Sequence, residues 1–223
     1  MLKEFIDRNE IKNALLGTII ADGYISKKRT KNANCNLEIT HTSKNLDYLK
    51  ELKYLIESID GIKCTIQEHN KNSENKKYFL YRLITSRNKY FTDLRDLLYK
   101  NNIKEFPKEI IDKFNDLSLF LLYLDDGTLR VRYKEGTSKL REARVSFCLD
   151  SFTYEEMKYF QKWLLSKYNI KTGIYRHSKN MELNRGFRIW TNTENTKKLM
   201  MIFDKYYNQI PSMNYKFLKY YSL

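Results

Sequence analysis

The sequence is organised around ALLGTIIADG, which spans residues 14–23, and around one echo of it, LFLLYLDDG, which spans residues 119–127. Each stretch is an apolar run that ends in Asp-Gly. Such a run predicts a buried helix whose terminal carboxylate lies where the backbone leaves the core. Gly23 suits the left-handed turn that commonly ends a helix. A single Asp-Gly end is ordinary turn chemistry, whereas two at matching places indicate a shared site.

The chain repeats its order of elements after 104 to 108 residues. Five pairs of landmarks follow the same order in both halves: Asp22 and Asp126, Ser43 and Ser151, Ile62 and Ile170, Arg82 and Arg188, Pro107 and Pro211. We therefore predict an α+β chain built as a tandem pseudo-twofold repeat of αββαββα units. Residues 1–110 would form the N-terminal repeat and residues 111–223 the C-terminal repeat, with the join near 108–115.

Hydrophobic periodicity places the elements within each repeat. In the first we expect a helix capped by Asn9 or Asp7, strands at 24–29 and 35–41, a helix at 43–58, a strand at 62–69, a loop at 70–77, a strand at 79–85 and a helix at 88–99. In the second we expect a helix capped by Asn115 or Asp116, strands at 128–133 and 144–149, a helix at 154–168, strands at 171–177 and 186–190, and a helix ending near 207. Two capping boxes are predicted, Thr153 with Glu156 and Thr191 with Glu194.

The charge balance indicates a polyanionic partner. The chain of 223 residues has 41 Lys+Arg against 27 Asp+Glu, a net charge of +14, which favours nucleic acid first and an anionic membrane second. No apolar run approaches the ~20 residues of a spanning helix, and charges interrupt the first residues where a signal peptide would be apolar. Three scattered cysteines are typical of buried thiols, and the three histidines lack the spacing of a zinc site. We expect no membrane association and no zinc.

Two acids at adjacent helix ends need an explanation. Asp22 and Asp126 would repel each other, and both would face the negative ends of the helix dipoles. Divalent cations would offset this cost, and oxygen-only ligands favour Mg²⁺.

The two motifs resemble LAGLIDADG motifs, and the whole chain resembles a single-chain LAGLIDADG homing endonuclease. The likeness extends over nearly the full length and is carried by SLFLLYLDDG, DSFTYEEMKYF, NNIKEFP and IPSMNYK. It implies a monomer with saddle-shaped antiparallel sheets and helices on the convex side. It also implies cleavage of both DNA strands across the minor groove with 3′ overhangs.

The resemblance assigns roles to particular residues. Asp22 and Asp126 would be the catalytic, metal-binding acids for two or three Mg²⁺ ions, which Mn²⁺ or Ca²⁺ could replace in binding. Asp125 is interpreted as the motif neighbour of the second acid and, with Ala21 at the matching place, joins the expected metal-binding set. Lys104 and Lys216 match basic residues near the scissile phosphates, although one precedes and the other follows its repeat's proline. The alternative is that they are two of many surface lysines.

The strands would supply the DNA surface. Alternation leaves one polar face on each sheet, and twisted strands would curve that face into a saddle that fits the major groove. Two halves of ~30 Å each would cover about 18 base pairs of double-stranded DNA. The expected DNA-binding residues are Lys63, Thr65, Gln67, Arg82, Arg130, Arg132, Lys171, Tyr175 and Arg188. A simple solvated face is the alternative for each of them.

The two motif helices differ in their small residues. The first has Gly17, Thr18 and Ala21, whereas the second has Phe120 and Leu121 at mid-helix and no glycine before the acid. This difference predicts an offset or wider seam between the helices.

The sequence thus predicts a Mg²⁺-dependent, site-specific endonuclease of the intron-homing type. An RNA maturase of the same fold, acting on its own intron RNA, is the alternative; intact acids in both motifs favour the nuclease. A catalytically silent DNA-binding regulator is a third interpretation. The resemblance points to a fungal mitochondrial intron, and a bacterial or phage cytoplasm stays open.

Overall fold

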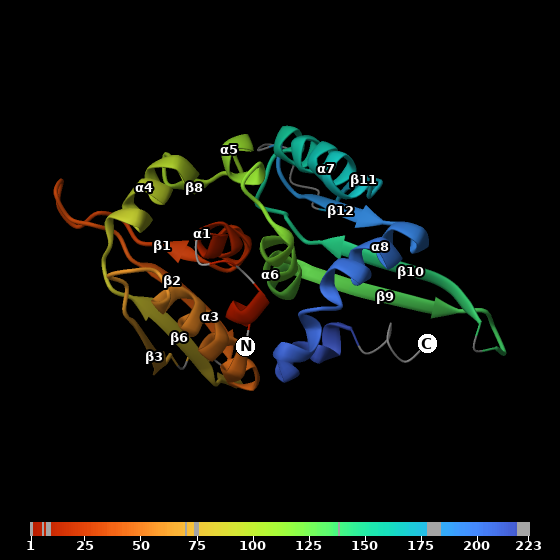
Figure 1. Ribbon diagram of the computed structural model, residues 1–223, viewed down its shortest axis with the longest axis horizontal. Coiled ribbons are helices and arrows are strands. Elements are labelled where there is room, and N and C mark those ends of the chain that lie inside the picture. Colours follow the sequence, from red (N-terminus) through yellow and green to blue (C-terminus); the bar gives the residue numbers. More distant parts are fainter. Residues whose placement is uncertain are drawn as a thin grey trace.

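Two four-stranded antiparallel sheets with one strand order lie on either side of a central group of helices (Figure 1). The computed structural model describes residues 2–5, 7, 10–69, 71–73, 76–137, 139–177 and 184–217. The first sheet has the order β1-β2-β6-β3, and the second, read from its β9 edge, has the order β9-β10-β12-β11. In both, the first, second, fourth and third strands of the repeat follow one another across the sheet. The α+β fold and the tandem repeat are therefore confirmed.

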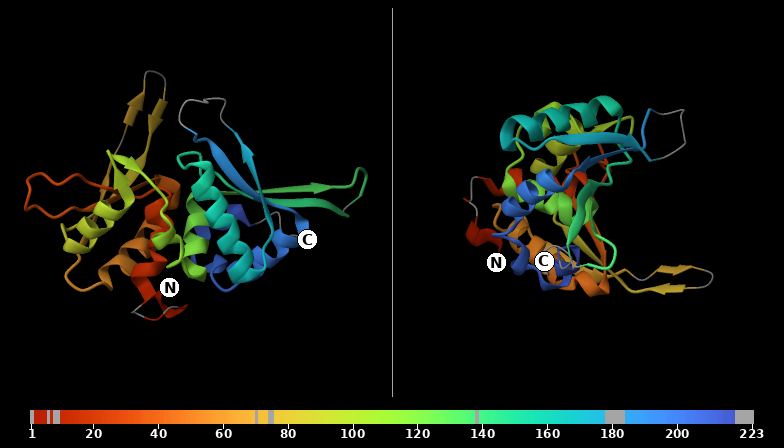
Figure 2. Two further views of the ribbon diagram at one scale, coloured as in Figure 1. Left: turned by 90° about the horizontal axis from the view of Figure 1, so that it is seen from above. Right: turned by 90° about the vertical axis from the view of Figure 1, so that its right-hand side faces the viewer.

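The strands of the two sheets have matching places but unequal lengths. Their bounds are β1 (Tyr24–Ile25), β2 (Leu37–Thr42), β3 (Cys64–Glu68), β6 (Leu80–Thr85), β9 (Gly127–Tyr133), β10 (Leu140–Phe147), β11 (Thr172–Arg176) and β12 (Phe187–Thr191). Two small hairpins, β4 (Lys71–Ser73) with β5 (Lys76–Tyr78) and β7 (Tyr99–Lys100) with β8 (Ile103–Lys104), complete the strands. The β4–β5 and β9–β10 hairpins extend away from the body in different directions (Figure 2).

The helices fill the centre and cover the buried faces of the sheets. The central helices are α1 (Ile11–Ala14), α2 (Leu16–Ile20) and α6 (Asp116–Asp126), of which α1 and α6 are labelled in Figure 1. The first sheet packs against α3 (Leu46–Glu57), and the second packs against α7 (Tyr154–Tyr168) and α8 (Thr193–Phe203). The remaining helices are α4 (Lys89–Leu98), α5 (Lys108–Ile111) and the 3-10 turns η1 (Leu2–Phe5), η3 (Ser43–Asn45), η4 (Tyr207–Gln209) and η5 (Pro211–Lys216). No helix within the described part of the chain is both long and apolar enough to cross a bilayer.

The seam between α2 and α6 is close, so the predicted widening is wrong. A Cβ atom on Gly17 would lie 1.9 Å from the carbonyl oxygen of Ser118 and 3.0 Å from the backbone nitrogen of Leu122. Backbone therefore meets backbone at this point. The small partner on α6 is Ser118, one turn before the Leu121 that matches Gly17 by offset. Ser118 Oγ also donates a hydrogen bond across the seam to the carbonyl of Asn13, at 2.8 Å.

The first motif helix departs from its prediction at both ends. It divides into α1 and α2, and α1 begins after Glu10 without a side-chain cap, so Asp7 does not cap it; Asn9 lies outside the described residues. Gly23 does not adopt the left-handed conformation expected of it. Glycine is needed there for space instead, because a Cβ atom would lie 2.7 Å from the Cα of Ile19.

The helix starts of the second repeat are mixed in outcome. Asn115 caps α6, and Thr153 caps α7 within a capping box with Glu156, as predicted; the capping box of Asn115 with Ser118 was not predicted. The box of Thr191 with Glu194 is wrong: Asn192 caps α8, and its side chain accepts a hydrogen bond from the backbone of Asn195. Thr191 instead ends β12 as a buried residue.

Other differences from the sequence prediction are in strand extent. The expected strand at 24–29 is only two residues long, the expected loop at 70–77 contains the β4–β5 hairpin, and the expected strand at 144–149 begins at Leu140. Of the cysteines, Cys35 and Cys64 are buried, Cys148 is half-buried, and all three are free thiols.

An aromatic cluster joins the two repeats. Phe106, from the end of the first repeat, packs on Phe152 and Phe160 of the second with ring centroids 5.4 and 5.3 Å away. The chain thus crosses to the second core just before α5. The division at residue 110 stays a prediction.

Candidate active site

The two motif acids meet at one cavity. Asp22 follows α2 and Asp126 ends α6, and both line a cavity of about 360 Å³ together with Lys104 and residues 148–152. The close seam at Gly17 causes this arrangement, because helices whose backbones touch leave their ends no room to diverge. The prediction that the acids come together is thus matched by the geometry.

The acids are held in conditions that favour their protonated forms. The pKa of Asp22 is raised to about 6, with burial as the largest cause and the nearby Asp125 carboxylate as the second. Burial likewise raises the pKa of Asp126 to about 7, with Asp22 and Asp125 adding to the effect. Asp22 and Asp125 thus disfavour the charge of Asp126, and Asp125 disfavours the charge of Asp22, as expected of neighbouring carboxylates.

Two lysines hold the ends of the motif helices in the same way. Lys104 Nζ donates to the carbonyls of Ile19, at 2.9 Å, and Ala21, at 3.3 Å, and also to Gly23. Lys216 Nζ donates to the carbonyls of Tyr123, Asp125 and Gly127, at 3.3, 3.2 and 2.9 Å. Each carbonyl of the second set lies 104 residues after one of the first. The lysines are thus equivalent in space although they flank their prolines on opposite sides.

The lysines offer positive charge at the negative ends of two helix dipoles. Burial lowers the pKa of Lys104 to about 8, and burial also lowers the pKa of Lys216 below its ordinary value. The nearby Asp carboxylates oppose that lowering in both cases. Both lysines are half-buried with fixed backbone partners, and their role near the scissile phosphates stays a prediction.

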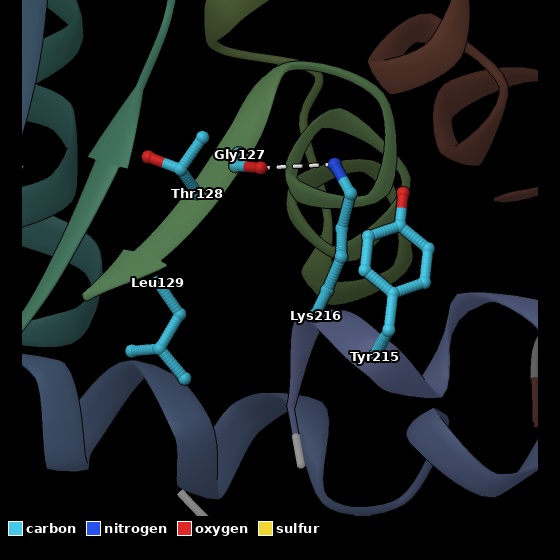
Figure 3. A pocket seen from close by; sticks show the side chains of 5 residues that line it. All are labelled: Gly127, Thr128, Leu129, Tyr215 and Lys216. Atoms are coloured by element: carbon cyan, nitrogen blue, oxygen red, sulfur yellow. Dashed lines mark hydrogen bonds between the residues drawn. The ribbon is translucent and has the colours of Figure 1, made fainter. Parts of the chain in front are cut away.

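A second cavity lies beside Lys216. It has a volume of about 460 Å³ and is lined by Gly127, Thr128, Leu129, Tyr215 and Lys216. Figure 3 shows the Lys216 side chain reaching the Gly127 carbonyl with the Tyr215 ring beside it. The two cavities therefore border the paired helix ends, one with each lysine.

The first half adds a histidine to the acids. His41 Nε2, from β2, lies 3.8 Å from Asp22 Oδ2 and 3.4 Å from Asp125 Oδ1. Burial alone would lower the pKa of His41, but the carboxylates of Asp125 and Asp22 raise it above its ordinary value. Sequence spacing could not reveal this group, because its members come from three elements. The sequence signal that could have indicated His41 is the alternation of buried and more exposed residues along β2, which places His41 on the buried face with Leu37 and Ile39.

The donor set at the helix ends fits a divalent cation. Asp22 and Asp126 supply oxygens at raised pKa, so a cation would relieve repulsion that the protein leaves in place. Both carboxylate oxygens of Asp125 are buried without a hydrogen-bond partner. The backbone carbonyls of Ala21 and Asp125 also face the site, where they accept from the two lysines.

The polar face of the first sheet carries its four expected residues. In the register, Gln67 is opposite Arg82 and Thr65 is opposite Ile84, and Lys63 directly precedes β3 in the same alternation. Arg82 Nη1 donates to Glu38 Oε2 at 3.1 Å, on the same face. Glu38 was not among the expected DNA-binding residues, which included no acids.

The polar face of the second sheet carries the other five. Tyr175 is opposite Arg188, and Lys171 precedes β11 in the same alternation. Arg132 is opposite Glu142, and Arg130 is opposite Arg144, a like-charged pair that was not predicted. Asp150, also missed, accepts from Arg188 at 2.7 to 3.0 Å. Arg82 and Arg188 therefore each have a carboxylate partner, although Glu38 lies within β2 and Asp150 lies after β10, so the two partners do not match in the repeat.

The protein is thus a duplicated α+β fold in which each repeat contributes one acid and one lysine to a shared central site. Residues 12–199 match the model of the LAGLIDADG DNA endonuclease family. The chain belongs to that family.

Curated relatives and solved structures agree with this assignment. The chain is 25% identical over 218 residues to the cytochrome b mRNA maturase bI2 of Saccharomyces cerevisiae, covering 94% of this chain and 48% of the maturase. The chain spans about half the length of the curated relatives that it matches.

The similar structures show the shared fold. The homing endonuclease I-WcaI, bound to its DNA recognition sequence, has a TM-score of 0.73 at 21% identity, covering 96% of this chain and 88% of that one. A variant of I-DmoI, in complex with nicked target DNA in the presence of Mn, has a TM-score of 0.55 at 18% identity, covering 90% and 99%. Another I-DmoI variant, with target DNA in the presence of Mg, has a TM-score of 0.51 at 18% identity, covering 88% and 95%.

Proposed function

We propose that this chain is a site-specific endonuclease of the intron-homing type that hydrolyses both strands of a long double-stranded DNA site. The observation that carries the proposal is the meeting of Asp22 and Asp126 at one cavity between the two repeats. Membership of a DNA endonuclease family supports it. So do solved relatives of the same fold that were bound to DNA targets.

Asp22 and Asp126, with the carbonyls of Ala21 and Asp125, would hold two or three Mg²⁺ ions, which Mn²⁺ or Ca²⁺ could replace in binding. Bound divalent ions supply a polarised phosphate and a water of lowered pKa. Related structures studied with Mn and Mg support this choice of ion. The chain's own acids orient the reacting groups, because their helices are fixed backbone to backbone.

Lys104 and Lys216 would offset negative charge that develops at the scissile phosphates. Each ammonium is fixed by carbonyls at the end of its motif helix, so its position is set before DNA binds. With a pKa of about 8, Lys104 keeps most of its charge at neutral pH but can exchange a proton readily.

The polar faces of the sheets would bind the DNA in its major groove, over about 18 base pairs. The DNA-binding role of the nine strand residues is part of this proposal. The cluster of Arg130, Arg132 and Arg144 on one polar face supports it, because these three cations share the single carboxylate of Glu142 and leave an excess of positive charge there. The net charge of +14 supports it as well. The chain would act as a monomer, since both halves of the site lie within it.

Cleavage of a randomised DNA library tests the proposal. We expect the chain with Mg²⁺ to release fragments that share one long sequence and carry 3′ overhangs, and to release none with EDTA. Cleavage without a shared sequence, or no cleavage at any site, would contradict it.

A maturase is the second candidate, favoured by the match to the yeast cytochrome b mRNA maturase. That relative also supports a fungal mitochondrial intron as the source, with a bacterial or phage cytoplasm as the alternative. Splicing of the chain's own intron RNA, measured with and without protein, distinguishes the two activities. A maturase accelerates splicing even when Asp22 and Asp126 are both replaced by Asn, whereas the nuclease alone does not affect it.

A further inference from the structure

Asp22, His41 and Asp125 bring three metal-binding atoms to one point. One carboxylate oxygen of each acid and a ring nitrogen of the histidine lie within 4.8 Å of one another. The residues come from the end of α2, from β2 and from α6 respectively. The trio therefore depends on the seam that brings the second half's Asp125 against the first half.

Asp125 has no acidic counterpart in the first repeat, where Ala21 stands at the matching position. Its side chain is 0% exposed, and neither of its oxygens has a hydrogen-bond partner. His41 is 8% exposed, and its Nε2 also has no hydrogen-bond partner. The contact of Asp125 Oδ1 with His41 Nε2 leaves this buried carboxylate without a well-formed hydrogen bond, so a cation between the two groups would stabilise the protein.

Other groups around the trio do not supply that ligand. Tyr48 Oη and Thr18 Oγ1 are buried beside the trio, and the Tyr48 hydroxyl interacts with both Thr18 and Asp125 without adding a positive charge. The ring of Tyr48 packs edge-on against His41, with centroids 5.0 Å apart. Lys216 adds positive charge to the region, but its three donors are directed at the carbonyls of Tyr123, Asp125 and Gly127.

The second half lacks the same arrangement. Ala21 stands at the place that matches Asp125, and Leu149 stands at the place that matches His41, as judged from the Ser43 and Ser151 landmarks. Both residues line the cavity of Asp126. The trio is thus specific to the Asp22 side and departs from the pseudo-twofold symmetry.

We propose that Asp22, His41 and Asp125 form a binding site for one divalent transition-metal ion, such as Zn²⁺, Co²⁺ or Mn²⁺. One imidazole with two carboxylates suits these ions, whereas Mg²⁺ prefers oxygen ligands alone. Ligands at 2.0–2.2 Å around a tetrahedral ion are separated by about 3.4 Å. The distance of 3.4 Å from His41 to Asp125 matches that separation, and the distance of 3.8 Å from His41 to Asp22 exceeds it by a few tenths of an ångström, which the exposed Asp22 side chain can close.

The site also has an entrance and an open position. The Asp22 side chain is 40% exposed, so an ion could enter past it and keep a water on that side. The site deepens the proposed nuclease function because it shares Asp22 with the catalytic centre. Its occupancy would make the cut nearer Asp22 dependent on the identity of the metal.

Titration of the full chain with Co²⁺, in excess Mg²⁺ and without DNA, tests this site. We expect one Co²⁺ to bind with the intense visible absorption of tetrahedral coordination. His41→Asn and Asp125→Asn should each weaken Co²⁺ binding by about tenfold or more and remove the absorption band. Asp126→Asn, the matched change at the second acid, should leave the band in place.

The alternative is a buried His41–Asp125 ion pair without a metal. Wild-type protein that gives no tetrahedral Co²⁺ band, or variants that all keep it, would overturn the proposal. Should the variants fail to fold by circular dichroism, the wild-type protein still decides: Mn²⁺ bound at this site must show coupling to a histidine nitrogen in pulsed electron paramagnetic resonance, and its absence refutes the site. DNA cleavage with Mg²⁺ but no Co²⁺ band contradicts this site alone, whereas Co²⁺ binding without any DNA cleavage contradicts the nuclease function alone.

Discussion

At the scale of single residues, the proposed chemistry depends on the surroundings of two aspartates, because burial and neighbouring carboxylates change the pH at which they ionise. Aspartates in solution ionise near pH 4, yet the pKa of Asp22 is raised to about 6 and that of Asp126 to about 7. Burial is the main cause for both, and carboxylate repulsion adds to it. The protein therefore maintains a site that is unfavourable when empty, as expected where a cation is to bind.

This placement predicts how cleavage depends on pH. Both acids must lose their protons to bind Mg²⁺, so double-strand cleavage at limiting Mg²⁺ should rise steeply between about pH 5.5 and about pH 7.5. The rise should move to lower pH as Mg²⁺ is increased, because the ion competes with the protons. Initial rates over this range check it. A rate that is constant from pH 5 to pH 8 would contradict the raised pKa values.

The same pKa values predict how the stability of the metal-free protein depends on pH. A carboxyl whose pKa is higher in the folded state binds more protons folded than unfolded, so stability falls as pH rises from about 4 to about 7. Asp126→Asn removes the charge and should raise the free energy of unfolding at pH 8 by about 1–2 kcal/mol. That is below the ~1.4 kcal/mol per pKa unit of a fully buried group, because water still reaches the carboxylate. Urea unfolding in EDTA at pH 4 and pH 8 measures it, and an equal stability of the two proteins at pH 8 would oppose it.

At the scale of elements, the seam of α2 and α6 decides the geometry of the site. Gly17 allows the two backbones to touch, which brings the acids at the helix ends together. The sequence reasoning expected an offset or wider seam because it sought the matching small residue at Leu121; the seam is not wider, and the contact of Gly17 lies one turn from Leu121. That reasoning overlooked Ser118 one turn earlier, whose backbone provides the contact.

Gly17→Ala should therefore be strongly destabilising. The added Cβ would lie 1.9 Å from the Ser118 carbonyl oxygen, and we expect a loss of about 3 kcal/mol, at the upper end of overpacking. Gly136→Ala is the matched control, since no atom lies within 4 Å of that Cβ position and only its φ of +67° opposes the change, at about 1 kcal/mol. Chemical unfolding compares the two. Equal losses would show that the seam can move apart and that the close contact does not fix the site.

Local sequence signals predicted most elements, but they did not predict which of two neighbouring residues caps a helix when one of them has a partner elsewhere in the fold. Thr153 and Asn115 cap their helices as expected, whereas Thr191 loses the cap of α8 to Asn192. The reason is tertiary: Thr191 Oγ1 accepts from the backbone of Val145 at 3.1 Å, inside the second sheet. Val145 and Thr191 are 46 residues apart in the sequence, so a capping pattern within a few consecutive residues could not predict this hydrogen bond.

At the scale of the whole molecule, the duplication made the fold predictable and its asymmetry made part of the site unpredictable. Landmarks at nearly the same offset identified both acids, and the lysines followed from the family resemblance. The roles of His41, Glu38 and Asp150 could not be predicted from the sequence, although Asp150 begins the stretch DSFTYEEMKYF, because each becomes informative only through contacts between elements. The unequal halves, with His41 and Asp125 on one side and Leu149 and Ala21 on the other, point to unequal environments for the two strand cuts.

The polar faces predict a salt-dependent interaction with DNA. If Lys171 contacts a phosphate, Lys171→Ala should weaken binding at all sequences and reduce the slope of log affinity against log salt by about 1. Lys162→Ala is the matched control, since Lys162 is an exposed lysine on α7, which packs behind the same sheet. Fluorescence anisotropy with duplex DNA at several salt concentrations measures both. Equal effects of the two changes would mean that the strand face is not the DNA surface.

The central claim is that Asp22 and Asp126 act as one composite nuclease centre. Its most direct test is cleavage of a supercoiled plasmid that carries the selected DNA site, with Mg²⁺, by the wild-type chain and by Asp22→Asn and Asp126→Asn. The wild-type chain should linearise the plasmid, and each variant should lose double-strand cleavage by at least about a hundredfold while still binding the site. Either variant producing linear plasmid at the wild-type rate would contradict the two-acid centre.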